Sequence, residues 1–97
     1  MIDKLEMFIA LAKEGHFGRA AERLNIAQPT LSAGIKQLEA QLGVQLVHRG
    51  SRFGGLTPEG QTALIWAKRI VDDARQLRDR MKLSQQGLSG EVRLAVI

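Results

Sequence analysis

The stretch that decides the fold is residues 17–46, FGRAAERLNIAQPTLSAGIKQLEAQLGVQL. It contains two helical patterns, expected at about Gly18–Leu24 and Pro29–Leu42, joined by the turn Asn25-Ile26-Ala27. Asparagine tolerates turn geometry, and proline suits the first helical position because its missing N–H has no helical partner there. This order of elements is typical of a helix-turn-helix, whose second helix enters the major groove of DNA.

The second helix of this stretch has a predicted buried side and a predicted free side. The buried stripe, at helical spacing, is Leu31, Ile35, Leu38 and Leu42. The residues that point elsewhere are Thr30, Ala33, Lys36, Gln37 and Gln41. A protein-docking face would carry large apolar side chains, so this mixture of small and polar residues favours DNA.

The flanking residues complete a winged helix-turn-helix. We expect a first helix at about Asp3–Glu14, with Asp3 as its N-cap and Gly15 as its C-terminal stop. Residues 45–49 and Leu56-Thr57 are expected to pair as a short hairpin around a glycine-rich tip. The predicted fold class is mainly α, with three helices and a β-hairpin wing followed by a long dimerisation helix.

The long helix is expected to begin at Thr57-Pro58 and to run to about Ser84. Its apolar residues alternate spacings of four and three, which predicts a coiled-coil-like dimerisation seam. The seam residues are Ala63, Ala67, Ile70, Ala74, Leu77 and Met81. The alternative is a helix packed on its own domain, but the core is too small to cover such a long helix.

These elements predict three regions along the chain. Residues 1–57 form a winged helix-turn-helix DNA-binding domain, and residues 58–86 form the linker or dimerisation helix. Residues 87–97 form a hinge and the first strand of a missing effector-binding domain, because the segment ends on an alternating apolar pattern.

The composition is that of one small basic domain with an appendage. The 97 residues carry a formal net charge of +4, which suits a polyanionic partner. Cysteine is absent from the sequence, which excludes disulfides, thiolate zinc sites and cysteine nucleophiles. His16 and His48 lack spaced carboxylate partners, so we expect neither an enzyme nor a metal site. Without a long apolar run or a secretory signal, we expect a cytoplasmic, nucleoid-associated protein with no membrane partner.

The chain resembles the N-terminal part of the LysR-type transcriptional regulators. The likeness is carried, in order, by Leu5 with Phe8, Phe17 with Ala20-Ala21 and Leu24, Gln28-Pro29 with Leu31-Ser32, Ile35, Leu38-Glu39, Leu42-Gly43, Leu46, Arg49, and Leu56-Thr57 with Gly60. Each pair is weakly specific, but the ordered set is highly specific. The resemblance implies a winged helix-turn-helix, a linker helix that pairs two subunits, and transcriptional control by a small-molecule inducer bound in the missing domain. No cofactor is expected in this part of the protein.

The first candidate DNA contacts lie at the N-terminal end of the second helix of the helix-turn-helix. Gln28 can form paired hydrogen bonds with adenine, and Pro29 and Thr30 can contact a thymine methyl group. Ser32 can donate to a phosphate or a base edge, and Lys36 is better placed for phosphate. In the family, the Gln-Pro pair and the serine match residues that touch DNA. The alternative for Gln28 is a helix-capping role.

Departures from the family pattern occur in the second helix of the helix-turn-helix and below the wing. Ala33 and Gly34 stand where the family often has long polar residues that read bases. Ala33 remains a candidate contact. We nevertheless expect fewer direct hydrogen bonds to bases and more dependence on DNA shape. Val47 replaces the usual phenylalanine, which predicts a smaller core plug under the wing.

Further candidate contacts lie on the wing and at the start of the second helix. An arginine at a hairpin tip can enter a narrow minor groove, and the family's wing arginine matches Arg52. Arg49 either contacts DNA or pairs with Glu39. Arg19 is a candidate phosphate contact. At His16 the family commonly has a serine, which would cap the helix and donate to a phosphate. His16 can do either of these less well, and the alternative is an exposed loop residue.

These residues together predict a sequence-specific regulator that binds double-stranded DNA. We expect a homodimer on an inverted-repeat operator, and a higher oligomer for the full-length protein. The alternative from another class is a protein-interaction module that uses the long helix without binding DNA. Steep salt dependence of duplex binding would distinguish the two.

Overall fold

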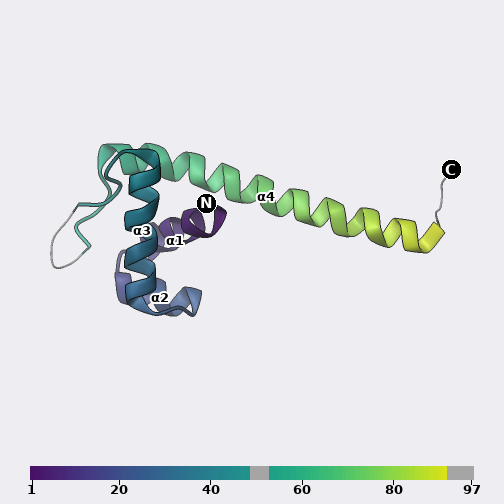
Figure 1. Cartoon of the computed structure of the whole chain (residues 1–97), viewed down its shortest axis with the longest axis horizontal. Helices are drawn as coiled ribbons and strands as arrows, with labels where there is room; N and C mark the ends of the chain where they lie inside the picture. The colour runs from purple at the N-terminus through teal and green to yellow at the C-terminus, as the bar shows by residue number, and fades with distance from the viewer. Residues whose placement is uncertain (49–52, 92–97) are drawn as a thin grey trace.

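The computed structural model describes residues 1–48 and 53–91, with side chains as far as residue 83. The described residues form four helices, α1 (Ile2–Glu14), α2 (Phe17–Leu24), α3 (Gln28–Leu42) and α4 (Pro58–Glu91). Helices α1–α3 and the start of α4 form one body, and the rest of α4 projects from it (Figure 1). The molecule measures 59 × 25 × 19 Å because of this projection. The predicted mainly α fold, with its helix-turn-helix and long last helix, is confirmed.

The helix-turn-helix boundaries follow from local chemistry. Gly15 and Asn25 end α1 and α2 with left-handed backbones, at φ 67° and φ 57°. Asparagine is among the few residues besides glycine that adopt this conformation readily. The turn after α2 is closed by two hydrogen bonds of 3.0 Å, from Asn25 N to Glu22 O and from Ile26 N to Ala21 O.

The start of α1 corrects one expectation. Met1 is the N-cap, and Leu5 N donates to Met1 O at 3.0 Å, so Asp3 lies inside the first turn and is not the N-cap. A carboxylate in the first turn is still favourable, because it faces the positive end of the helix dipole. The helix begins earlier than predicted because Ile2 packs against the core.

The core lies where α1, α2 and α3 meet the base of the wing. Its largest fully buried side chains are Phe8, Leu11, Leu31, Ile35, Leu38, Leu46 and Val47. The small Ala20 and Ala21 are also buried, which lets α2 approach its neighbours closely. Val47 fills the core beneath the wing with a small side chain, as predicted. Leu42, predicted to be buried, is 41% exposed, because it lies in the last turn of α3 where the core ends.

Gly34 lies on the buried side of α3 and not on its exposed side. A Cβ atom at this position would stand 2.4 Å from Met7 Sδ, so α1 covers the helix there. Gly34 is therefore covered by Met7, although the family resemblance leads us to expect a base-reading position here. A larger residue at this position would have to displace the flexible side chain of Met7.

The wing is a minimal hairpin in the described residues. Val47 and Leu56 form one antiparallel bridge, shorter than the two predicted strands. Hydrogen bonds from His48 N to Gly55 O (2.9 Å) and from Thr57 N to Leu46 O (3.0 Å) flank it. The pairing of the two predicted segments is confirmed, and the tip, residues 49–52, lies outside the described part of the chain.

Thr57 joins the wing to α4. Its Oγ1 accepts a hydrogen bond from Gly60 N at 2.9 Å, which confirms the predicted N-cap. The same oxygen donates to Gln45 O at 2.5 Å. Gly60 lies directly on the wing, because a Cβ there would stand 2.0 Å from Leu46 O. The first turn of α4 is thus fixed on the root of the wing.

Helix α4 differs from the prediction in its length and in the face that packs on the domain. It continues to Glu91, past the expected end near Ser84. Its sequence has no proline after Pro58 that would interrupt it. Ala67 is only 1% exposed and, with Val71, packs into the core. Ala67 is therefore covered by its own domain and is not available as a seam residue.

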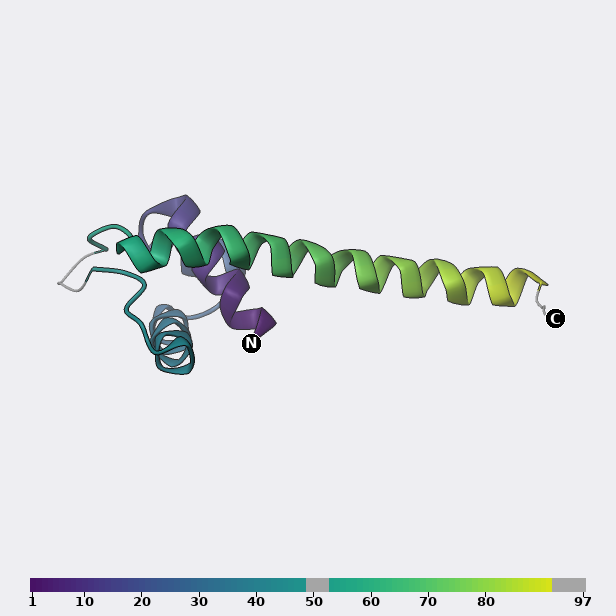
Figure 2. The same ribbon diagram turned by 90° about the horizontal axis from the view of Figure 1, so that it is seen from above.

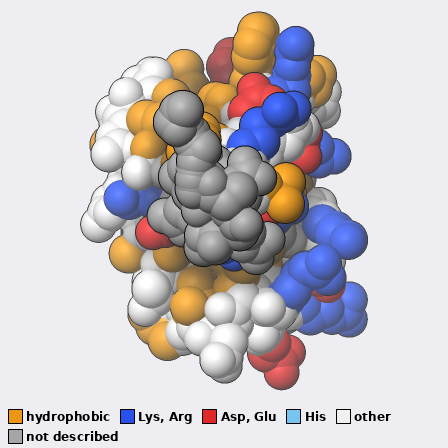
Figure 3. All heavy atoms as spheres, turned by 90° about the vertical axis from the view of Figure 1, so that its right-hand side faces the viewer, with side chains coloured by type: hydrophobic (Ala, Val, Ile, Leu, Met, Phe, Trp, Pro, Cys, Tyr) orange, Lys and Arg blue, Asp and Glu red, His pale blue; other side chains and the backbone are white. Residues whose placement is uncertain are grey.

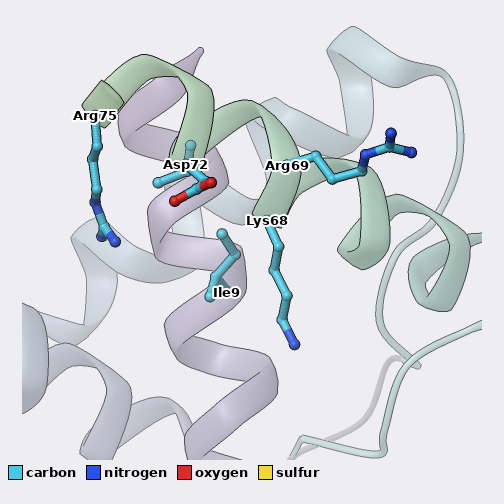
Figure 4. A pocket seen from close by; sticks show the side chains of 6 residues that line it. Ile9, Lys68, Arg69, Asp72 and Arg75 are labelled. Atoms are coloured by element: carbon cyan, nitrogen blue, oxygen red, sulfur yellow. The ribbon is translucent and has the colours of Figure 1, made fainter. Parts of the chain in front are cut away.

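A shallow groove of about 420 Å³ lies between α1 and α4. Figure 4 shows Ile9 of α1 beside Lys68, Asp72 and Arg75 of α4. Nearby, Arg75 Nη2 lies 3.8 Å from Glu6 Oε2, a partly exposed ion pair between the two helices. The groove is lined by α1 and α4, so it is separate from the exposed surface of α3. Within the described residues, no helix combines the length and the apolar character that crossing a membrane requires.

Candidate nucleic-acid interface

The exposed N-terminal half of α3 is the candidate DNA-contacting surface. Figure 1 shows this end of the helix far from α4, and Figure 2 shows α3 end-on below it. Buried Leu31 and Ile35 hold the opposite side of the helix in the core. The sequence-predicted contacts Gln28, Pro29, Thr30, Ala33 and Lys36 are all exposed, and Ser32 is half-buried. The structure therefore places these six residues along the free side of α3, from its first residue to its middle.

Gln28 is the first residue of α3, and it does not occupy the cap position. The N-cap is Ala27, whose methyl side chain has no hydrogen-bonding atom. The amide of Gln28 instead extends toward α2, with Oε1 3.6 Å from the place a Cβ would take on Gly18. Gln28 therefore does not have the capping role that was its alternative, and its exposed side-chain amide can reach a base edge.

His16 is the N-cap of α2. Its Nδ1 accepts a hydrogen bond from Arg19 N at 3.2 Å, so His16 caps the helix, which is one of its two predicted roles. In the neutral ring, an accepting Nδ1 leaves the proton on Nε2, which is then a donor. His16 and Arg19 are both exposed beside the N-terminal end of α3, where they can approach a phosphate.

The described part of the wing packs against α2. The rings of Phe53 and Phe17 meet edge to face, with centroids 6.3 Å apart and planes 74° apart. This contact places the wing beside the N-terminal end of α2. The predicted wing contacts Arg49 and Arg52 lie outside the described residues.

Lys4 is a residue that the sequence reasoning missed. It shares an open groove with Pro29, Thr30 and Gln37, between the start of α1 and the exposed side of α3. A cation beside the recognition surface is suited to a phosphate of the DNA backbone. A lysine in a helical first turn gives no such signal in the sequence, because the packing of α1 on α3 is a tertiary feature.

The second exposed feature is an apolar stripe along α4, which begins where the helix packs on the core and continues onto its projecting part. Trp66, Ile70, Leu77 and Met81 lie within about 60° of one another around the helix. All four are exposed, Trp66 at 56% and Leu77 at 60%. Ala63 and Ala74 of the predicted seam lie beside them and are half-buried. The sequence reasoning missed Trp66 because Ala67 fits the same spacing.

The guanidinium of Arg69 lies over the ring of Trp66, 5.0 Å from its centroid. Seen from the far end of α4, many of the visible Lys and Arg side chains lie along one side (Figure 3). The described residues hold no group of three or more His, Cys, Asp or Glu side chains suited to a metal ion.

The arrangement defines the class of the protein: a winged helix-turn-helix domain with a long linker helix. A family model described as "Bacterial regulatory helix-turn-helix protein, lysR family" matches residues 2–61. The chain belongs to this family.

Relatives of known name support the assignment. The SDS degradation transcriptional activation protein of Pseudomonas sp. (strain ATCC 19151) is 45% identical over 91 residues, which are 94% of this chain and 30% of that protein. The HTH-type transcriptional regulator XapR of Escherichia coli (strain K12) is 43% identical over 93 residues, which are 96% of this chain and 32% of that protein. The chain therefore spans about a third of the length of these relatives.

Solved structures of DNA-binding domains have the same fold. The complex of the BenM DNA-binding domain with benA site 1 DNA matches with a TM-score of 0.80 and 36% identity, covering 90% of this chain and 98% of that one. The CbnR DNA-binding domain in complex with DNA matches with a TM-score of 0.79 and 37% identity, covering 88% and 98%.

Proposed function

We propose that this chain is the DNA-binding part of a transcription regulator that reads double-stranded DNA in a sequence-specific way. One observation carries the proposal: the N-terminal end of α3 is exposed, and its free face holds polar and small side chains. Gln28 is assigned to base recognition and Lys36 to phosphate, with Pro29, Thr30, Ser32 and Ala33 completing the contact surface. The DNA complexes of BenM and CbnR, whose domains share this fold, support the same partner.

The exposed stripe on α4 supports a homodimer. Four large apolar residues along a projecting helix would be costly to leave in water, and a second copy of α4 covers them. Two paired chains present two copies of α3, so we propose an inverted-repeat operator. Sensing of a small-molecule inducer and higher assembly are proposed for the length of the relatives that this chain does not span.

A protein-interaction module without DNA binding is the weaker proposal. The exposed turns of α3 that start at Gln28 carry amide, hydroxyl and ammonium groups, which suit DNA better than an apolar protein groove. The salt dependence of duplex binding separates the two. A fall in affinity of several orders of magnitude between low and physiological salt requires several neutralised phosphates.

Replacing Gln28 tests the base-reading role. We expect Gln28→Ala to weaken binding to the selected operator by about 1–3 kcal/mol per subunit, because the paired hydrogen bonds to a base are lost. Affinity for random duplex is expected to stay the same. Operators are first selected from random duplexes, and binding of each variant is then titrated on operator and random DNA.

The matched control is Gln41→Ala, which makes the same change on an exposed residue near the other end of α3. Its operator affinity is expected to equal that of the parent chain. Equal losses for Gln28→Ala on operator and random DNA would contradict a base-reading role for this amide.

Replacing Arg52 tests the wing. A narrow A·T-rich minor groove has the most negative potential, and an arginine inserted there gains most from it. We expect Arg52→Ala to cost about 1–2 kcal/mol on operators with A·T-rich flanks and much less on those with G·C-rich flanks. Binding curves on the two duplexes give the comparison, and equal losses on both would reject the minor-groove contact.

A further inference from the structure

The carboxylate of Glu39 is buried and hydrogen-bonded, and the proposed function does not explain why it is there. This residue lies in the second half of α3, and it is only 7% exposed. Its Oε2 accepts hydrogen bonds from Leu46 N at 2.7 Å and from Val47 N at 3.3 Å. A buried charge is costly unless it is well hydrogen-bonded, so this position has a specific task.

The two donors belong to the root of the wing. Val47 forms the bridge with Leu56, and Leu46 O accepts the hydrogen bond from Thr57 N. The backbone carbonyl of Glu39 also accepts hydrogen bonds from Gly43 N (2.8 Å) and Val44 N (3.2 Å). One residue of α3 therefore holds the chain at four points as it passes from the recognition helix into the wing.

The same segment is held from the opposite side by α4. Thr57 Oγ1 donates to Gln45 O, and Gly60 lies against the carbonyl of Leu46. Residues 45–47 thus lie between the side chain of Glu39 and the first turn of α4. Since α3 carries Gln28 at its other end, Glu39 connects the root of the wing to the same helix that carries the candidate base-reading residue.

We propose that Glu39 is a positioning residue for DNA recognition. It sets the wing at the orientation in which the wing and the N-terminal end of α3 contact the same DNA together. Glu39 does not itself touch DNA. The proposal rests on the proposed function, because it requires the wing to contribute to binding.

The test compares the parent chain with Glu39→Gln, which keeps the size of the side chain but removes the charge that strengthens both hydrogen bonds. Binding is measured on the operator with A·T-rich and with G·C-rich flanks. The parent chain is expected to prefer the A·T-rich flank about tenfold, and Glu39→Gln less than about twofold. Affinity for random duplex, and protection of the bases contacted by α3, are expected to stay as in the parent.

A control for simple destabilisation is Val71→Ala, which trims a buried side chain where α4 meets the core, away from the wing. It is expected to lower the melting temperature and keep the flank preference. If Glu39→Gln is less than nine-tenths folded at the assay temperature by circular dichroism, Glu39→Asp takes its place under the same criteria.

A double-mutant cycle with Arg52→Ala shows whether Glu39 acts through the wing. If it does, Arg52→Ala has almost no further effect in the Glu39→Gln chain, so the two losses are not additive. Additive losses, a flank preference retained by Glu39→Gln, or an equal loss on both flanks each overturn the positioning role. A parent chain without flank preference overturns the wing contact and this inference with it, whereas the Gln28 test of base reading stands apart.

Discussion

Gly60→Ala is expected to destabilise the protein by about 2–4 kcal/mol, because its added methyl group makes the tightest contact with backbone among the glycines whose surroundings the structure describes. The new Cβ would stand 2.0 Å from Leu46 O and 2.9 Å from Leu46 C, and both are backbone atoms that cannot rotate away. Either α4 moves off the wing or Leu46 shifts and weakens its hydrogen bond with Thr57 N. The gain in helix propensity from glycine to alanine, about 1 kcal/mol, offsets only part of this cost.

The measurement is urea unfolding followed by circular dichroism at fixed protein concentration, since association would itself add stability. Gly34→Ala is the matched control. Its Cβ would meet Met7 Sδ at 2.4 Å, but a thioether at the end of a flexible side chain can move aside. We expect its stability to lie within about 1 kcal/mol of the parent. A Gly60→Ala chain as stable as Gly34→Ala would show that the contact with Leu46 is not tight.

Leu77→Glu is expected to convert the proposed dimer to monomers and to lower operator affinity by about a hundredfold or more. Leu77 is exposed in the single chain and lies in the middle of the apolar stripe, so a carboxylate there would be buried in a paired helix interface. Two linked α3 helices bind an operator with high effective concentration, and separate chains lose that advantage. Sedimentation equilibrium gives the association state, and titration with operator duplex gives the affinity.

Leu83→Glu is the matched control for this experiment. Leu83 is 67% exposed on the same helix, but it lies about 120° around the axis from Leu77. We expect it to leave the dimer intact. Dimer dissociation equal in the two variants would place the pairing surface on another face of α4. Trp66 is the single tryptophan of the chain and lies in the stripe, so its fluorescence reports pairing directly.

The sequence predicts local structure well where one residue type has one conformational use. Gly15, Asn25 and Pro29 mark the ends and starts of helices, and the structure has helix boundaries within two residues of them. The N-cap role of Thr57 at the start of α4 is predicted from the sequence in the same way. These predictions depend on near neighbours in the chain, so no tertiary information is needed.

The sequence predicts less well which residues of a helix face the core. Helical spacing fits Ala67 and Trp66 almost equally, and only the packing of α4 on the core shows that Ala67 is buried. Leu42 fits the stripe of α3, yet the core ends before it. Gly34 is covered by Met7 from α1. Each error concerns the position of another helix, which spacing within one helix does not contain.

The candidate interface was predictable in part. Gln28, Pro29 and Lys36 are exposed as expected, because their side of α3 is free of large apolar side chains. The position of Lys4 beside α3 depends on how α1 packs, and the sequence gives no sign of it. The role of the buried Glu39 depends on backbone donors seven and eight residues further along.

Because α4 projects far from the domain, the spacing of the two half-operators would depend on the register in which two α4 helices pair. In a pair of such helices, sliding one along the other by seven residues displaces the attached heads by about 10 Å. That distance equals about three base pairs along B-DNA, where one turn of 10–10.5 pairs spans about 34–36 Å. In the proposed dimer, the side chains that hold one α4 against the other therefore also decide how far apart the two half-operators must lie, without touching a base.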